Sequence, residues 1–468
     1  MSEAEAPFSV LRQSSDAEAV AAIERLVREA PDHAVNKVNA VDLATKEGLD
    51  EERVVGALLH AARLGLFEMS WNVICQSCGG TLDANASLKT LNQPEYRCAF
   101  CAAAYETTLD HMVEVTFMVS PRLRKIAAHN PDELAAVEYY RQIFWSSGMD
   151  LPTDYEQVLD QVTLDLIELP PGERAILSLQ LPAGLLIVFD PVTHAAQFLD
   201  VKGEPTGERQ NLALVLSNVR TPTTSIEMRP GPLRLALENR SQLRVLPAVW
   251  VTSPRLHELL GRRKPALTAK RLLTNQTFRD LYRTDTLAID QRLKITSLTF
   301  LFSDLKGSTE LYERVGDLVA FDLVKEHFRV LNEIIASERG AVVKTIGDAV
   351  MATFAEPDRA VAAAIRMRDA MRDLGEQRQL QDLLLKMGIH EGPCLAVTLN
   401  DQQDYFGQTV NFAARVQNLA DSRAIVVTGQ VLGDPQASAL LQARGIKATP
   451  RRAALRGIPD EMAVYEIA

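Results

Sequence analysis

Apolar residues near the start of the chain recur at helical spacing. A predicted amphipathic helix has them three or four positions apart, at Ala19, Ile23, Leu26 and Val27. Two more helices are predicted over 40–45 and 51–64, with Gly48 as the break between them. A strand then begins near residues 65–68. Helix, glycine turn, helix and strand is the outline of a winged helix-turn-helix, which we expect over residues 1–70.

The hydrophobic pattern changes twice in the middle of the chain. Residues 121–149 have a helical pattern, so a helical connector is expected over 119–160. Apolar and polar residues then alternate between Pro and Gly turns, and the predicted strands are 175–179, 185–189, 212–216, 232–237 and 243–251. This spacing predicts an antiparallel β-sandwich over 161–253, followed by a basic, helical transducing linker over 254–295.

The last part of the chain alternates between strand-like and helix-like segments. Strands are predicted at 298–302, 341–346 and 349–354, the last two joined by Gly347-Asp348. A helix from Asp317 is expected to bury Leu318, Phe321, Val324, Phe328, Leu331 and Ile335. After an alanine-rich helix, 359–374, come two strands, 383–390 and 393–399. Strand, helix, strand, strand, helix, strand is the ferredoxin-like order, so the whole chain is expected to be multidomain α+β.

Composition narrows the class of protein. The chain has 468 residues, of which 47% are hydrophobic and 24% charged, typical of a soluble protein with about three domains. Its net charge of −11 argues against a protein that coats nucleic acid or an anionic membrane. It has no apolar run long enough for a transmembrane helix and no signal-peptide pattern at its start, so a cytoplasmic protein is expected.

Four of the five cysteines form two closely spaced pairs, Cys75 with Cys78 and Cys98 with Cys101. Each pair with two intervening residues forms a tight turn, and two such turns enclose one tetrahedral Zn²⁺. We therefore expect a structural zinc ribbon over 71–118 rather than disulfides, which are rare in the cytosol. Four thiolates leave no open position for catalysis. The fifth, Cys394, is expected in the core.

Charge argues against nucleic-acid binding by the winged-helix-like region. Residues 1–130 contain 12 Lys and Arg against 18 Asp and Glu. The second helix of the pair also begins with Asp50-Glu51-Glu52, which would repel phosphates. Packing or protein docking is favoured, and a nucleic-acid-binding zinc and winged-helix regulator remains an alternative.

Two carboxylates of the last domain are placed where metal ions could bind. Asp304 ends a buried strand and is followed by Gly307-Ser308-Thr309, which lead into a helix. Asp348 lies at the predicted hairpin tip. Either aspartate alone is ordinary capping or turn chemistry, but together they could share two metal ions beside a phosphate-binding helix start.

Four segments, in order, resemble the class III nucleotide cyclase catalytic domain. They are FSDLKGST (302–309), KTIGDAVMA (344–352), GIHEG (388–392) and DYFGQTVNFAAR (404–415). The resemblance covers residues 296–468, and the upstream region looks like the N-terminal part of some bacterial soluble cyclases. Ser303 and Ala349 stand where Thr and Gly are common in the family.

The resemblance implies roles for individual residues. Asp304, Asp348 and the backbone of Leu305 would hold two Mg²⁺ or Mn²⁺ ions, and Gly307, Ser308 and Thr309 would bind the phosphates. Lys344 and Asp404 would recognise adenine, Asn411 would orient the ribose, and Arg415 would stabilise charge on the α-phosphate. Arg456 is a weak candidate for the residue that grips the triphosphate.

The family's metal carboxylates come from one protomer and its Asn and Arg from the other, so a homodimer is implied. We expect an adenylyl cyclase that makes 3′,5′-cyclic AMP and pyrophosphate from ATP, regulated by its N-terminal region through an unidentified ligand or protein. Two alternatives remain open. One is guanylyl cyclase activity, and the other uses the cyclase fold as a nucleotide sensor for the nucleic-acid-binding regulator.

Overall fold

The computed structural model describes residues 5–91, 93–217, 225–283, 287–288, 291–306, 313, 315–378, 384–399, 402–421, 424–454 and 461–467. The chain divides into two compact units. The first comprises Met1–Ala86, Gln93–Thr107 and His111–Leu267, and the second comprises Ser87–Asn92, Thr108–Asp110 and Thr268–Ala468. The main division, after Leu267, falls inside the segment that we expected to be a linker.

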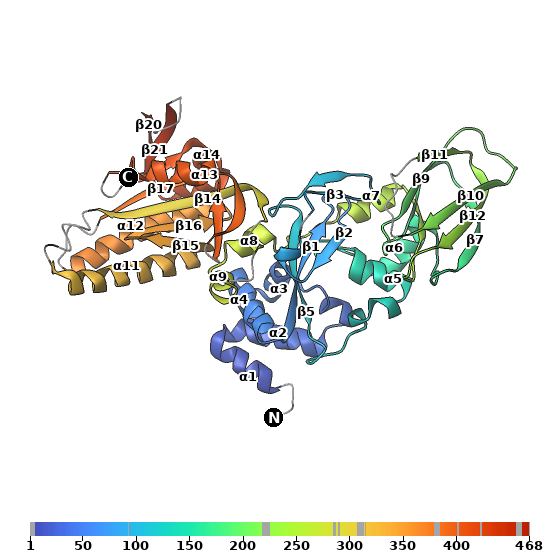
Figure 1. Cartoon of the computed structure of the whole chain (residues 1–468), viewed down its shortest axis with the longest axis horizontal. Helices are drawn as coiled ribbons and strands as arrows, with labels where there is room; N and C mark the ends of the chain where they lie inside the picture. Colours follow the sequence, from blue (N-terminus) through green and yellow to red (C-terminus); the bar gives the residue numbers. More distant parts are fainter. Residues whose placement is uncertain are drawn as a thin grey trace. The chain divides into compact units, whose positions relative to one another are not determined.

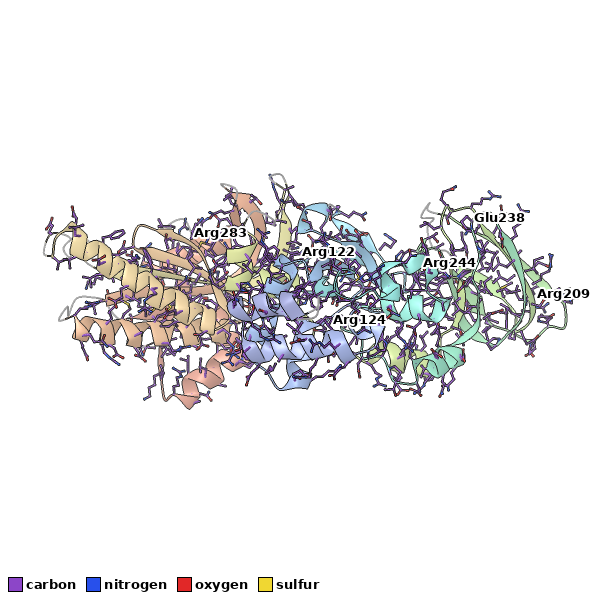
Figure 2. The ribbon with its side chains drawn as sticks, turned by 90° about the horizontal axis from the view of Figure 1, so that it is seen from below. Arg122, Arg124, Arg209, Glu238, Arg244 and Arg283 are labelled. Atoms are coloured by element: carbon purple, nitrogen blue, oxygen red, sulfur yellow. The ribbon has the colours of Figure 1, made fainter. Side chains whose placement is uncertain are left out.

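The first unit begins with four helices, α1 (Glu5–Ser14), α2 (Ala17–Glu29), α3 (Ala40–Glu47) and α4 (Glu51–Arg63), and a 3₁₀ turn at Asp32–Ala34 (Figure 1). Asp16, Asn39 and Asp50 cap the starts of α2, α3 and α4 by accepting hydrogen bonds from backbone N–H groups. Gly48 ends α3 with a φ of 65°, which glycine adopts without steric cost. Arg124, labelled in Figure 2, donates to the carbonyls of Val27 and Ala30 at the end of α2.

These helices are followed by a small antiparallel sheet in the order β2-β1-β5, formed by β1 (Phe67–Ile74), β2 (Thr81–Asn85) and β5 (Val113–Val119). A 3₁₀ turn (Leu88–Thr90) and the hairpin of β3 (Glu95–Arg97) and β4 (Ala104–Glu106) lie between β2 and β5 in sequence. The helix, glycine turn, helix and strand predicted for residues 1–70 are thus all present. Whether they act as a winged helix stays a prediction.

The helical connector expected over 119–160 consists of several short pieces, and the helical pattern of 121–149 does not form one helix. The structure has 3₁₀ turns at Ala127–His129 and Pro131–Glu133, a short α5 (Ala136–Tyr139) and a π-helix (Tyr140–Phe144) before α6 (Tyr155–Val162). Pro131 lacks an N–H group and disfavours helical backbone in Asn130, which has φ −127° and ψ 72°. Burial also competes, because Tyr140, Phe144 and Trp145 are almost fully buried in an aromatic cluster.

Two small sheets with a shared apolar core form the predicted sandwich. The first has the order β10-β12-β7, with β7 (Arg174–Leu181), β10 (Gln210–Leu216) and β12 (Gly231–Asn239). The second has the order β11-β9-β8-β13-β6, with β6 (Thr163–Leu166), β8 (Gly184–Phe189), β9 (Ala196–Val201), β11 (Ser225–Met228) and β13 (Ala248–Val251).

The sandwich is not wholly antiparallel as expected. The pairs β9 with β11 and β10 with β12 are parallel. The strands from β9 to β12 belong alternately to the two sheets. After each strand the chain crosses to the other sheet and then returns, so the next strand in the same sheet runs parallel to the first. The helix α7 (Pro254–Gly261) then completes the regular elements of the first unit.

The main segment of the second unit, from Thr268, begins with two short helices, α8 (Ala269–Leu273) and α9 (Gln276–Leu281). The elements that follow are β14 (Leu293–Lys306), α11 (Asp317–Ser337), β15 (Gly340–Ile346), β16 (Ala349–Phe354), α12 (Pro357–Gln377), β17 (Leu384–Leu399), β18 (Gln402–Phe406), α13 (Gln408–Gln417), β19 (Ile425–Thr428), α14 (Gly429–Gly433), α15 (Pro435–Ala443), β20 (Ala448–Ala453) and β21 (Met462–Ile467). From β14 to β17 this is the predicted ferredoxin-like order, and the sheet has the order β15-β16-β14-β17-β19-β21-β20, with β18 on β17.

The two strands predicted at 383–390 and 393–399 are one continuous strand, β17. Pro393 does not end it, because the pairing of β14 with β17 is irregular between Ile295 and Leu298, opposite this proline. A proline is tolerated at such a bulge because no ladder hydrogen bond from its nitrogen is needed there.

Helices cover both faces of the sheet. One core cluster combines α11, α12 and α15 with the sheet, and a second packs Val416 of α13 on Val426 and Val464 of the other face (Figure 1). The predicted buried face of α11 is partly wrong, since Leu318 is 84% and Phe321 63% exposed. At 100° per residue, Leu318 lies about 140° around the helix from the buried Leu331.

Candidate functional site

Strand pairing brings Asp304 and Asp348 together. Ser303 pairs with Val350 across β14 and β16, so Asp304 follows directly at the level of the turn that contains Asp348. Burial and the charge of Asp348 both raise the pKa of Asp304, while Lys386, its partner on β17, lowers it. The two carboxylates thus lie close enough for their charges to repel each other.

The two carboxylates fit a divalent cation. Asp348 Oδ2 is buried and has no hydrogen-bond partner among the described residues. An unpartnered carboxylate oxygen beside a second carboxylate is a ligand arrangement that Mg²⁺ or Mn²⁺ would satisfy. The side chain of Leu305 is buried in the sheet. Its backbone carbonyl is therefore the group that this residue could offer.

The structure adds a histidine that our sequence reasoning missed. His327 of α11 is fully buried and lies beside the backbone of Asp348. Burial lowers its pKa to about 4, although the nearby Asp348 opposes that shift. The ring is therefore neutral at pH 7. Its place in the apolar stripe of α11, four residues before Leu331, was the available signal.

Lys344 of β15 and Asp404 of β18 form an ion pair, with 2.5 Å between Lys344 Nζ and Asp404 Oδ2. Lys344 is exposed and Asp404 is buried. The other carboxylate oxygen of Asp404 accepts a hydrogen bond from the backbone N–H of Tyr405 at 2.8 Å. One donor and one acceptor are thus held side by side at the surface of the second unit.

Asn411 and Arg415 lie one turn apart on α13, so their side chains share a face of the helix. Gly388 of β17 allows α13 to approach, because a Cβ at this glycine would lie 2.1 Å from the backbone nitrogen of Gln417. No hydrogen bond or ion pair among the described residues joins Asn411 or Arg415 to either of the two pairs above. The predicted phosphate-binding residues Gly307, Ser308 and Thr309, and the candidate Arg456, lie outside the described residues.

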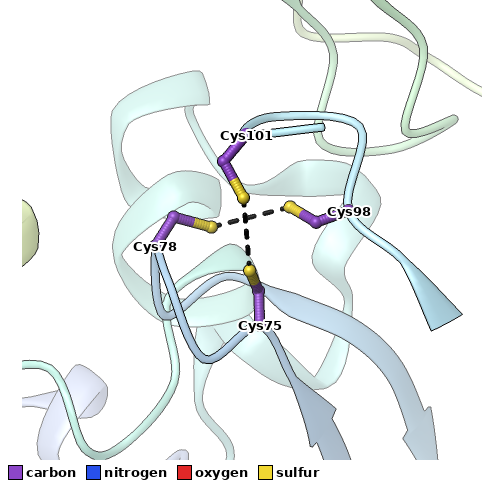
Figure 3. A group of neighbouring side chains, drawn as sticks. All are labelled: Cys75, Cys78, Cys98 and Cys101. Atoms are coloured by element: carbon purple, nitrogen blue, oxygen red, sulfur yellow. Dashed lines mark hydrogen bonds between the residues drawn. The ribbon is translucent and has the colours of Figure 1, made fainter. Parts of the chain in front are cut away.

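The four predicted zinc ligands form a second cluster, in the first unit (Figure 3). The sulfur atoms of Cys75 and Cys101 are 3.4 Å apart, those of Cys78 and Cys98 are 3.6 Å apart, and all four lie within 4.8 Å of one another. Zn–S bonds of about 2.3 Å in a tetrahedron require sulfur separations of about 3.8 Å. The donor set and its spacing therefore fit Zn²⁺. Cys394 of β17 is buried, and burial raises its pKa to about 12.

Two family comparisons together match most of the chain. The family of unknown function (DUF5939) matches residues 1–280. The adenylate and guanylate cyclase catalytic domain matches residues 291–467, which contain every predicted metal-binding, base-recognising and catalytic residue of the second unit. This confirms the family resemblance of the C-terminal part.

Individual relatives match about a third of this chain or less. A receptor-type adenylate cyclase of Trypanosoma congolense is 26% identical over 36% of this chain and 27% of its own length. The adenylate cyclase of Anabaena cylindrica is 25% identical over 36% of each protein, and guanylate cyclase 32E of Drosophila melanogaster is 27% identical over 28% of this chain and 12% of its own. The chain thus spans about a third or less of the length of these relatives.

Solved structures also match part of the chain. The adenylyl cyclase CyaB from P. aeruginosa is 24% identical and covers 38% of this chain and 96% of its own, with a TM-score of 0.34. Among the described residues, no helix is both long and apolar enough to cross a membrane. The chain belongs to the family of unknown function (DUF5939), and its residues 291–467 form a class III adenylate and guanylate cyclase catalytic domain.

Proposed function

We propose that the protein is an adenylyl cyclase, which converts ATP to 3′,5′-cyclic AMP and pyrophosphate. The observation that carries this choice of base is the Lys344–Asp404 pair, at 2.5 Å. Adenine offers an acceptor at N1 and a donor at its 6-amino group, which match a Lys donor and an Asp acceptor. Guanine offers the opposite polarity at both positions, so these residues favour ATP over GTP.

Asp304, Asp348 and the Leu305 carbonyl would hold two Mg²⁺ or Mn²⁺ ions, which when bound lower the pKa of the ribose 3′-hydroxyl and neutralise phosphate charge. In the reaction, the 3′-oxygen forms a bond to the α-phosphorus as the bond from that phosphorus to the leaving pyrophosphate oxygen breaks. The hydroxyl proton is lost to solvent. Asn411 would orient the ribose, and Arg415 would stabilise the negative charge that develops on the α-phosphate.

The site is completed by a second copy of the chain in this proposal, with the two aspartates from one protomer and Asn411 and Arg415 from the other. Exposed apolar side chains near the site support such an interface. Ile346, two residues before Asp348, is 56% exposed, and Phe406, two residues after Asp404, is 65% exposed. Large apolar groups at the surface are typical of residues that a partner covers.

The base choice is tested by measuring cyclic nucleotide production from ATP and GTP in parallel, with Mg²⁺ or Mn²⁺, for the purified full-length chain. We expect ATP turnover that disappears in Asp304→Ala. A preference for GTP would contradict our interpretation of Lys344 and Asp404. DNA retention at low salt without turnover of either nucleotide would favour the alternative of a nucleic-acid-binding regulator instead.

The shared site is tested by mixing two inactive variants, Asp304→Ala and Arg415→Ala. Each homodimer lacks one half of both sites, whereas the mixed dimer contains one intact site. We expect activity to return on mixing. If subunit exchange is demonstrated, for example by native mass spectrometry, and activity does not return, the two halves of the site do not come from different protomers.

Regulation by the N-terminal region completes the proposal. The DUF5939 match ends at residue 280, within α9, and α8 and α9 belong to the compact unit that holds the cyclase domain. Sites formed at subunit interfaces respond to small rotations, so a signal carried through residues 254–295 would alter activity. Zinc in the four-cysteine cluster would keep its part of the first unit folded.

A further inference from the structure

An arginine from outside the matched cyclase domain reaches the base-recognising residues. Arg279 lies on α9, twelve residues before the cyclase match begins at residue 291. Its Nη2 atom donates to the backbone carbonyl of Gln403 at 2.8 Å and to that of Val343 at 3.3 Å. These two carbonyls belong to the residues directly before Asp404 and Lys344.

The strands that carry Lys344 and Asp404 are not paired with each other. Among the described strands, β15 pairs with β16, and β18 pairs with β17. The pairing of β15 with β16 is irregular between Val342 and Lys344, so Val343 is the extra residue of a β-bulge. A bulge redirects the following side chain and leaves its extra residue outside the ladder. Arg279 binds the carbonyl of this residue and so connects two strands that the sheet leaves unconnected.

The helix that presents Arg279 is itself anchored in the second unit. Gln276 Oε1 accepts a hydrogen bond from the backbone N–H of Val342 at 2.8 Å. Asn275 caps α9 by accepting a hydrogen bond from the N–H of Phe278. The ring of Phe278 is buried and stacks on Tyr282, with 5.2 Å between the ring centroids. Because α9 is attached to β15 in this way, it holds the guanidinium of Arg279 beside the strand that carries Lys344.

Among the described residues, no carboxylate pairs with the guanidinium of Arg279, which binds these two carbonyls instead. The side chain lines a pocket with Gln276, Tyr282, Val342 and Gln403, and its Nη1 atom is buried without a hydrogen-bond partner among the described residues. The nearby carboxylate of Asp280 pairs instead with Arg283 and accepts a hydrogen bond from Gln276. A charged donor with no carboxylate partner binds backbone carbonyls strongly.

We propose that Arg279 is a positioning residue that fixes the spacing of Lys344 and Asp404, and with it the preference for ATP over GTP. The proposal rests on the function proposed above, in which this pair reads the base. It gives the last helix of the DUF5939-matched region a role in substrate specificity. Discrimination between the two purines requires both contacts at once, so a shift of one strand relative to the other weakens it.

The test uses the full-length chain with Arg279→Ala, Arg279→Lys and a matched control, Arg283→Ala. Arg283, labelled in Figure 2, lines the same pocket but pairs with Asp280 at 3.9 Å. For each protein, kcat and KM are measured with ATP and with GTP, and equilibrium affinities for both nucleotides are measured separately. Thermal unfolding of each variant shows whether it is folded.

In Arg279→Ala we expect the ratio of kcat/KM for ATP to that for GTP to fall about tenfold, the size of effect typical of one charged hydrogen bond. Arg279→Lys is expected to restore part of the ratio, because a single Arg nitrogen makes both bonds and one ammonium group could replace it. Arg283→Ala is expected to keep the native ratio.

An equal loss for ATP and GTP in folded Arg279→Ala would overturn the proposal, since a merely structural role lowers both alike. If the native chain binds nucleotides without turning them over, the proposed function fails while the affinity ratio still tests Arg279. A native chain that prefers GTP contradicts the base assignment itself, and with it this proposal.

Discussion

Phe100 connects the four-cysteine cluster to the aromatic core of the first unit. It lies between Cys98 and Cys101 and is 1% exposed. Its ring makes edge-to-face contacts with Phe189 and Trp250, with centroid distances of 5.1 and 5.3 Å. Further contacts join it to Phe144 and Trp145. Closing the second cysteine turn around a metal ion therefore also places this ring in the core.

The structure sets the size of the effect. Truncating a buried Phe to Ala costs about 3–5 kcal/mol, which includes the contacts that the ring loses. We therefore expect Phe100→Ala to lower the free energy of unfolding of the zinc-loaded first unit by about 3–5 kcal/mol. With zinc removed, the turn that holds Phe100 loses its closure. In the zinc-free chain, the same substitution should lower the free energy of unfolding by less than about half of this amount.

The assay is urea unfolding of the full-length chain followed by tryptophan fluorescence, with zinc and after chelation. The chain's three tryptophans, Trp71, Trp145 and Trp250, all belong to the first unit, so the signal reports on that unit alone. Phe8→Ala is the matched control. Phe8 is also 1% exposed but lies on α1, away from the cysteines in the sequence. Its cost should not depend on zinc.

An equal cost for Phe100→Ala with and without zinc would refute the coupling between metal and aromatic core. Zinc content measured on the purified chain provides an independent check. We expect one equivalent per chain, lost in Cys98→Ser. A native chain without zinc, whose stability chelators do not change, would show that the cluster is not a structural metal site.

Three further predictions concern buried groups. Burial lowers the pKa of His390 to about 4, so the unfolded state binds more protons than the folded state between pH 6.5 and 4. Lowering the pH through this range should therefore reduce the free energy of unfolding by about 3 kcal/mol, and His390→Gln should not show this loss. Gly388→Ala places a Cβ 2.1 Å from the Gln417 nitrogen, and we expect displacement of α13 and at least about a hundredfold loss of cyclase activity in a kinetic assay. Lys37, whose pKa burial lowers to about 8 despite the charge of Glu114, donates to Thr81 and to the Ile143 and Trp145 carbonyls. Lys37→Met should cost about 1–3 kcal/mol in urea unfolding, because it leaves these acceptors unpaired.

Local features of the fold were predictable because short-range chemistry determines them. The cysteine spacing predicted the cluster that the structure contains, since each turn is formed by residues a few positions apart. The alternation of apolar segments predicted the order from β14 to β17, because each element buries a face of its own. The proximity of Asp304 and Asp348 also followed, since a strand end and a hairpin tip meet whenever β14 pairs with β16.

Predictions failed where packing selects between alternatives of similar local energy. Several apolar residues on α11 could have faced the sheet, and the sheet selected the face that contains Leu331 and left Leu318 exposed. The helical pattern of 121–149 gave way to short turns because its aromatic residues are buried in a common cluster. The parallel strands of the sandwich arise from the path of the chain between two sheets, which alternation of apolar residues does not encode.

The sequence by itself determined the family of the C-terminal domain and the candidate residues for metal and base. It could do so because those residues lie in short motifs whose chemistry depends on spacing along the chain. The connection from Arg279 to the carbonyls of Val343 and Gln403 was decided by the tertiary structure alone. These partners are 64 and 124 residues away from Arg279, and backbone carbonyls have no side-chain signature, so only the folded chain shows which arginine binds them.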